Sequence, residues 1–105
     1  MRAIYKYPIP FGGEATVQIP ASAELLKFGV QGINANGTSN LCVWAIVDTT
    51  DTETQALKIR IHGTGQPLPD NTVFYLGNGD LEYQYYDTIF DREFVWHIFV
   101  GTDNT

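Results

Sequence analysis

Residues 60–70, RIHGTGQPLPD, contain the groups that could bind an anion. The stretch holds one of the two histidines of the chain and a threonine between Gly63 and Gly65. Backbone N–H groups at such glycines can point toward an anion, and the missing Cβ atoms let a ligand approach closely. No Gly-Lys-Ser/Thr motif is present, and Pro67 and Pro69 argue against the helix that follows a phosphate-binding loop. The simpler alternative is a turn in which the glycines take positive φ.

The segment before this turn, ALKIRIH at 56–62, alternates apolar and polar residues with a period of two. The pattern predicts a strand with Leu57, Ile59 and Ile61 inside and the basic residues outside. An arginine can bind phosphate through two N–H groups, and a nearby aromatic ring can stack on a base. The sequence thus predicts a site for a small anionic ligand such as a nucleotide, and the alternative is a solvated basic stripe. The candidate ligand-binding residues are Lys58, Arg60, His62, Gly63, Thr64, Gly65 and His97.

The sequence supports a catalytic role less than it supports ligand binding. His97 lies in an apolar strand, where it is either a core histidine with one backbone partner or a ligand-stacking or general-base residue. Two histidines and one cysteine, Cys42, do not make a metal site, and no cofactor is predicted. The aspartates at 48, 51, 80 and 91 lie in turn contexts, where aspartate has a structural role. No spacing of a catalytic triad is found, so the sequence favours a binding protein over an enzyme; a small nucleotide-processing enzyme remains an alternative.

The elements that must position these residues are short strands. Alternating or apolar segments occur at 3–9, 15–19, 24–30, 41–47, 56–62, 72–77, 81–90 and 93–100, separated by turn residues. They predict an all-β fold, a small antiparallel sandwich or partly closed barrel of about seven or eight short strands, in one domain over 1–105. The last strand is expected to be central, and Pro8 indicates that the first strand either lies at an edge or ends there. Leu26, Phe28 and Val30 are expected on one inward face, and residues 31–40 in a loop.

Two of these strands, 41–47 and 94–100, are apolar on both faces except for His97. Four side chains would then point outward: Trp44, Ile46, Val95 and Phe99. One explanation is that loops or other strands of the chain cover them. The other is that they form a homo-oligomer interface, most simply that of a two-fold dimer.

The net charge of −6 limits the possible partners. Six Lys and Arg residues spread along the chain do not supply a basic face, so no direct nucleic-acid binding is expected. Five of the twelve acidic residues lie within 80–93, where they either aid solubility or form a patch for a basic host protein. No apolar run is long enough for a membrane helix, and no signal peptide is evident. The single cysteine is expected to be buried, which fits a reducing compartment. These features together predict a cytoplasmic protein.

Several segments in order resemble a family of short proteins common in bacteriophages and prophages. They are YKYPIP, LLKFGVQG, LCVWAIVD, RIHGTGQPLP, FYLGN and FVWHIF. The chain departs from the family pattern at Gln66, where the family often has histidine, and in a longer segment before the last strand. The resemblance implies a phage setting but no activity. Together with the small size, the acidic charge and the aromatic-rich strands, this setting suggests an accessory protein that inhibits a host defence component or sequesters a nucleotide signal. A virion structural or assembly protein is the alternative.

Overall fold

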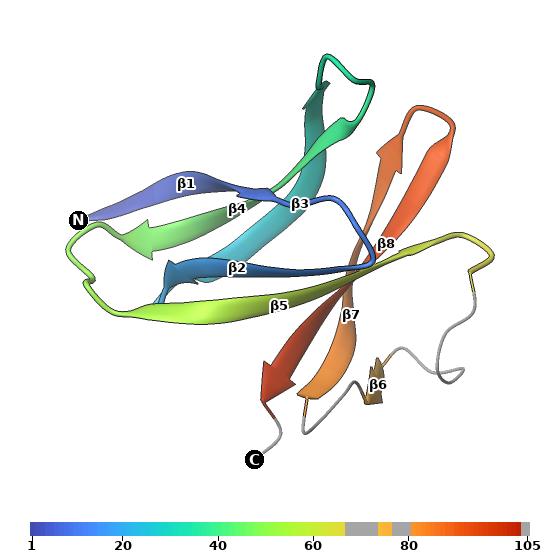
Figure 1. Cartoon of the computed structure of the whole chain (residues 1–105). Helices are drawn as coiled ribbons and strands as arrows, with labels where there is room; N and C mark the ends of the chain where they lie inside the picture. The colour runs from blue at the N-terminus through green and yellow to red at the C-terminus, as the bar shows by residue number, and fades with distance from the viewer. Residues whose placement is uncertain (67–73, 77–80, 104–105) are drawn as a thin grey trace.

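The computed structural model of the chain describes residues 1–66, 74–76 and 81–103 (Figure 1). These residues form eight strands and no helix, and accordingly contain no helix able to cross a membrane. The strands are β1 (Arg2–Ile9), β2 (Glu14–Pro20), β3 (Glu24–Ile33), β4 (Ser39–Asp48), β5 (Thr54–Gly63), β6 (Phe74–Leu76), β7 (Leu81–Asp91) and β8 (Phe94–Asp103).

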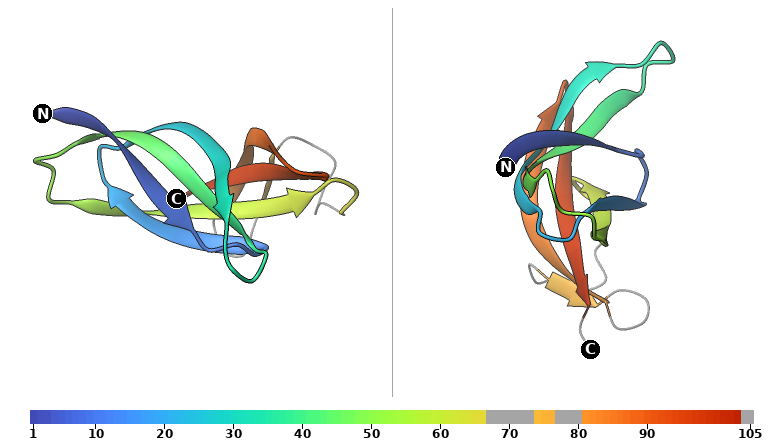
Figure 2. Two further views of the ribbon diagram at one scale, coloured as in Figure 1. Left: turned by 90° about the horizontal axis from the view of Figure 1, so that it is seen from above. Right: turned by 90° about the vertical axis from the view of Figure 1, so that its left-hand side faces the viewer.

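The strands form two antiparallel sheets that pack face to face. The three-stranded sheet has the order β1-β4-β3, and the five-stranded sheet has the order β2-β5-β8-β7-β6 (Figures 1 and 2). A hydrogen bond joins the sheets at the corner between β3 and β7: the Tyr86 hydroxyl donates to the Leu25 carbonyl at 2.9 Å. The prediction of an all-β antiparallel sandwich is confirmed, and the sheets do not close into a barrel. The central last strand and the edge position of the strand with Pro8 are also confirmed.

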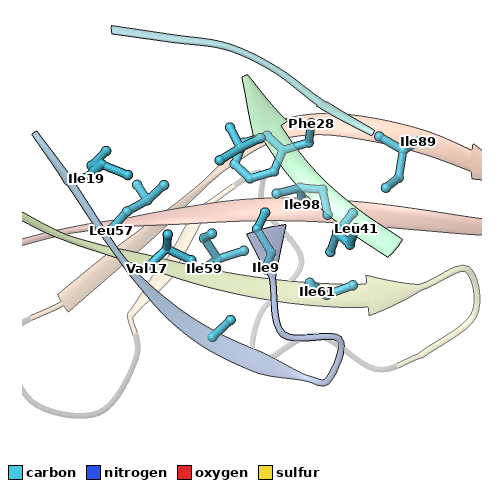
Figure 3. Close-up of a cluster of buried hydrophobic side chains, with 12 residues drawn as sticks. Ile9, Val17, Ile19, Phe28, Leu41, Leu57, Ile59, Ile61, Ile89 and Ile98 are labelled. Carbon is cyan, nitrogen blue, oxygen red and sulfur yellow. The ribbon is translucent and has the colours of Figure 1, made fainter. Parts of the chain in front are cut away.

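The core lies between the sheets and is built from inward residues of β1 to β5, β7 and β8 (Figure 3). The period of two correctly predicted that β2 and β5 contribute three residues each to this core. Phe28, Val43, Ile59 and Ile98 are fully buried at its centre. The whole cluster comprises Ile9, Ala15, Val17, Ile19, Phe28, Leu41, Val43, Leu57, Ile59, Ile61, Ile89 and Ile98.

Strand β3 departs from the predicted alternation. Leu26 is 42% exposed, although it was expected inside with Phe28. The reason is a β-bulge: Leu25 pairs with Ala45 and Lys27 with Trp44, so Leu26 is an extra residue and the alternation shifts at this point. The expected loop over 31–40 is also shorter, since β3 runs to Ile33 and β4 starts at Ser39.

The segment predicted at 72–77 is described only as β6, Phe74–Leu76. The turn residues NGD at 78–80, between two of the predicted strands, and the prolines at 67 and 69 lie outside the described residues. The following hairpin, β7–β8, turns through Arg92, which has a φ of 57°. In Figure 1 its turn lies at the same end of the molecule as the β3–β4 turn.

Candidate functional site

The predicted ligand-binding residues of β5 and β8 meet on the outer face of the five-stranded sheet. Leu57, Ile59 and Ile61 point into the core, so Lys58, Arg60 and His62 point outward. In the β5–β8 register, Lys58 pairs with Gly101, Arg60 with Phe99, and His62 with His97. The structure therefore places the predicted basic row directly beside the outward row of the central strand.

The two cations of this row have different partners. Arg60 forms an ion pair with Glu14 at 3.4 Å, and its guanidinium lies over the Tyr83 ring, 5.1 Å from the centroid. Lys58 donates to the neutral Thr16 hydroxyl at 3.3 Å. The positive charge of Lys58 lies beside a neutral hydroxyl and is available to a ligand. The positive charge of Arg60 is partly offset by the Glu14 carboxylate.

Gly101 explains how Tyr83 reaches Arg60 across the central strand. Tyr83 and Lys58 are the two cross-strand neighbours of Gly101. A Cβ at Gly101 would lie 2.9 Å from Tyr83 Cε1 and 3.1 Å from Lys58 Cβ. Because Gly101 has no side chain, the Tyr83 ring has room to lie over the β8 backbone. The ring is almost fully buried there.

Two further aromatic rings, on β8 and β7, also border the basic row. His62 and Tyr85 each make edge-to-face contacts with Phe99, with centroid distances of 5.5 and 5.9 Å. Tyr85 remains 44% exposed, whereas Phe99 is buried. Burial, followed by the nearby charges of Arg60 and His97, lowers the pKa of His62. The neutral imidazole is therefore favoured on this face.

The Gly63–Gln66 segment is a closed turn. Gln66 N–H donates to the Gly63 carbonyl at 3.1 Å, and Gly65 has a φ of 91°, as the third residue of a type II turn requires. The Gly63 N–H donates to Gln66 Oε1 at 2.8 Å, and the Thr64 N–H to the Val95 carbonyl at 3.3 Å. Three of the four N–H groups are thus used inside the fold. The geometry favours the turn over an anion-binding cradle.

His97 is held by hydroxyl groups on both sides. Its Nε2 lies 2.9 Å from Thr64 Oγ1, and its Nδ1 lies 3.1 Å from Thr88 Oγ1. The Tyr85 hydroxyl extends this chain, 2.6 Å from Thr88 Oγ1. The sequence predicted His97 and Thr64 as site residues but missed Thr88 and Tyr85. A bulge at Tyr86 changes the register of β7 between them, so simple alternation could not place both on one face.

A second polar cluster joins the two sheets. Asp91, at the end of β7, is buried, and its carboxylate accepts from the Ser39 hydroxyl at the start of β4. It also accepts from Arg92 Nε at 3.3 Å and from Trp96 Nε1 at 3.4 Å. The hydrogen bond from Ser39, with those from Arg92 and Trp96, lowers the pKa of Asp91.

Another acid of the 80–93 segment also has a structural role. Asp87 pairs with Lys27 at 2.9 Å and accepts from the Phe28 N–H at 3.4 Å. Asp87 and Asp91 therefore both tie β7 to the three-stranded sheet. The side chains at 80 and 82 lie outside the described residues.

The four predicted interface residues lie on two different faces. Trp44 and Ile46 are half-buried on the outer face of the three-stranded sheet, and Val95 and Phe99 belong to the outer face of the five-stranded sheet. The Trp44 ring lies against Gly29, where a Cβ would come within 3.0 Å of Cζ3. The homo-oligomer stays a prediction, which sedimentation at micromolar concentrations can check.

Within the described part of the chain, no group of three or more His, Cys, Asp or Glu side chains is placed to hold a metal ion. Comparison with curated proteins and with solved structures gives no match. A family model does match, over residues 1–105, and its description is "Domain of unknown function (DUF7352)". The chain thus belongs to the DUF7352 family.

Proposed function

We propose that the chain is a binding protein for a small anionic ligand with an aromatic ring, of the nucleotide class. The site is the outer face of the five-stranded sheet, centred on Lys58, Arg60 and His62. The observation that supports the proposal is the basic row of β5 lying beside Tyr85 and Phe99 on the neighbouring strands. Charge and exposed ring together are what a phosphate and a base need.

Each group has a specific role in this proposal. Lys58, which has no carboxylate partner among the described residues, contacts the phosphate. Arg60 adds an N–H group after exchanging its partly exposed contact with Glu14 for the ligand. Tyr85, which is 44% exposed, stacks on the base.

The biological setting is proposed from the resemblance to short phage and prophage proteins. A small acidic protein with such a site would act in the cytoplasm of an infected cell, by sequestering a nucleotide signal on which host defence depends. Inhibition of a host protein by the same face is the alternative form of this function.

Isothermal titration calorimetry with a panel of linear and cyclic nucleotides tests the proposal. We expect one nucleotide to bind wild type, with about tenfold or greater loss of affinity in Lys58→Ala, since a charge-assisted hydrogen bond contributes about 1.5–3 kcal/mol. Lys6→Ala is the matched control, because Lys6 also bonds a neutral side chain, Gln31, but on the other sheet. Absence of binding to wild type, or equal affinity in Lys58→Ala, would show that the row is only solvated surface.

A further inference from the structure

We propose that Thr64 and His97 form a nucleophile and general base able to hydrolyse small carboxylic esters. This inference goes beyond the binding function and does not depend on it. It starts from the short distance between Thr64 Oγ1 and His97 Nε2, 2.9 Å, which is the contact that lets an imidazole remove a hydroxyl proton.

The histidine is oriented for this role. With its Nε2 accepting from Thr64, the Nδ1–H donates to Thr88 Oγ1 at 3.1 Å. Thr88 is in turn held by the Tyr85 hydroxyl at 2.6 Å. Nucleophile, base and orienting group therefore follow one another as in other hydroxyl nucleophile sites, with a threonine in place of the usual carboxylate. A neutral orienting group fixes the ring but stabilises the imidazolium less, so slow turnover is expected.

The turn also presents a donor for the developing oxyanion. Among the described residues, the N–H groups of Gly63, Thr64 and Gln66 have partners, whereas that of Gly65 has none. Gly65 directly follows the nucleophile, the position that supplies one oxyanion-hole donor in enzymes with a nucleophile elbow. Its φ of 91° requires glycine, which links the Gly-Thr-Gly spacing to the chemistry.

A cleft beside Thr64 supplies space for the substrate. Its volume is about 510 Å³, and it runs from the turn to the beginning of β8. Its walls include the apolar side chains of Phe94, Val95 and Trp96, which suit an apolar acyl chain. The substrate class is thus a small ester with an apolar acyl group.

The reaction balances with water as the only co-reactant. Thr64 Oγ1 bonds the acyl carbon while its proton passes to His97 Nε2. The ester C–O bond then breaks, and the leaving alkoxide takes that proton. Water next attacks the acyl carbon as His97 accepts its proton; the acid leaves, and the proton returns to Thr64. The net change is ester plus water to acid plus alcohol.

Hydrolysis of p-nitrophenyl butyrate tests the proposal, with circular dichroism on every variant. We expect Thr64→Ala and His97→Gln each to lower kcat/KM about 100-fold, within the range of general base catalysis, and Thr64→Ser to retain activity. Thr49→Ala, which removes a threonine hydroxyl that donates to the Met1 carbonyl outside this site, is the matched control and should remain active. Thr88 is a positioning residue, so Thr88→Ser should retain the activity that Thr88→Val loses.

Labelling of wild type gives a readout that needs no variant to fold. A fluorophosphonate probe followed by peptide mass spectrometry should place the label on Thr64. No label at Thr64, together with hydrolysis no faster than in His97→Gln, would overturn the proposal. Equal loss of activity in Thr49→Ala would also overturn it, because the loss would then not depend on the Thr64–His97 pair.

Discussion

The buried carboxylate of Asp91 is expected to control the stability of the sandwich. It joins the last residue of β7 to Ser39 at the first residue of β4, and so connects the two sheets at one end. Asp91 is only 5% exposed and Ser39 only 6%. Removing the carboxylate in Asp91→Ala leaves the Ser39 hydroxyl without its acceptor in a site that water hardly reaches.

The magnitude follows from the bonds that are lost. A hydrogen bond to a charged group contributes about 1.5–3 kcal/mol, and the long 3.4 Å contact from Trp96 Nε1 contributes less. We expect Asp91→Ala to lower the free energy of unfolding by about 2–4 kcal/mol, against a total of about 5–15 kcal/mol for a small domain. Asp91→Asn keeps the shape and one acceptor, so its loss should be smaller.

Urea denaturation followed by tryptophan fluorescence measures this loss. A loss of about 3 kcal/mol shifts the midpoint by about 1–3 M for a typical small-protein slope. Glu53→Ala is the control, because Glu53 is exposed and its side chain has no hydrogen bond among the described residues. An Asp91→Ala variant within about 0.5 kcal/mol of the control, a usual change for a surface substitution, would refute the reasoning.

The lowered pKa of Asp91 adds a pH dependence with a definite sign. Above the pKa of the unfolded state, near 3.9, the carboxylate is ionised in both states and its stabilisation is fully present. As pH falls below that value, the unfolded state binds the proton first, and stability is lost until the folded pKa is passed. Asp91→Asn should therefore show a shallower loss of stability below pH 4 than wild type, and an identical slope would contradict this assignment.

Two further substitutions test the packing of aromatic rings. Trp96→Ala should cost about 3–5 kcal/mol, because the indole contacts Phe11 edge-to-face at 5.0 Å and stacks on Phe94 at 5.8 Å; unchanged thermal stability would show that the ring is dispensable. Gly101→Ala should cost about 1–3 kcal/mol by displacing Tyr83, whereas Gly13→Ala, with nothing within 4 Å, is the control. Equal thermal midpoints for the two glycine variants would contradict the predicted clash.

Strand positions and core faces were readable from the sequence because burial on one face imposes a period of two. This holds for β2 and β5, whose inward residues were predicted correctly. It fails where a bulge adds a residue, as at Leu26 and Tyr86, since nothing in the local pattern marks the insertion. The contacts of the site depend on these bulges and on pairing between distant strands, so the hydroxyl groups around His97 could not be derived from spacing.

Glycines explain how outward aromatic residues can be covered without a partner chain. Gly29 lies beneath Trp44 and Gly101 beneath Tyr83, and a Cβ added at either glycine would lie only 2.9–3.0 Å from the ring. A ring that lies flat over a glycine of a neighbouring strand buries much of its surface within its own sheet. Trp44 therefore needs no second copy of the chain to be half-buried. Apolar surface remains open on β1, where Ile4 is 62% exposed, and near the β7–β8 turn, where Phe90 is 77% and Phe94 46% exposed. If the predicted homo-oligomer forms, its contacts should include this turn, because burying those two rings gains more than covering Trp44.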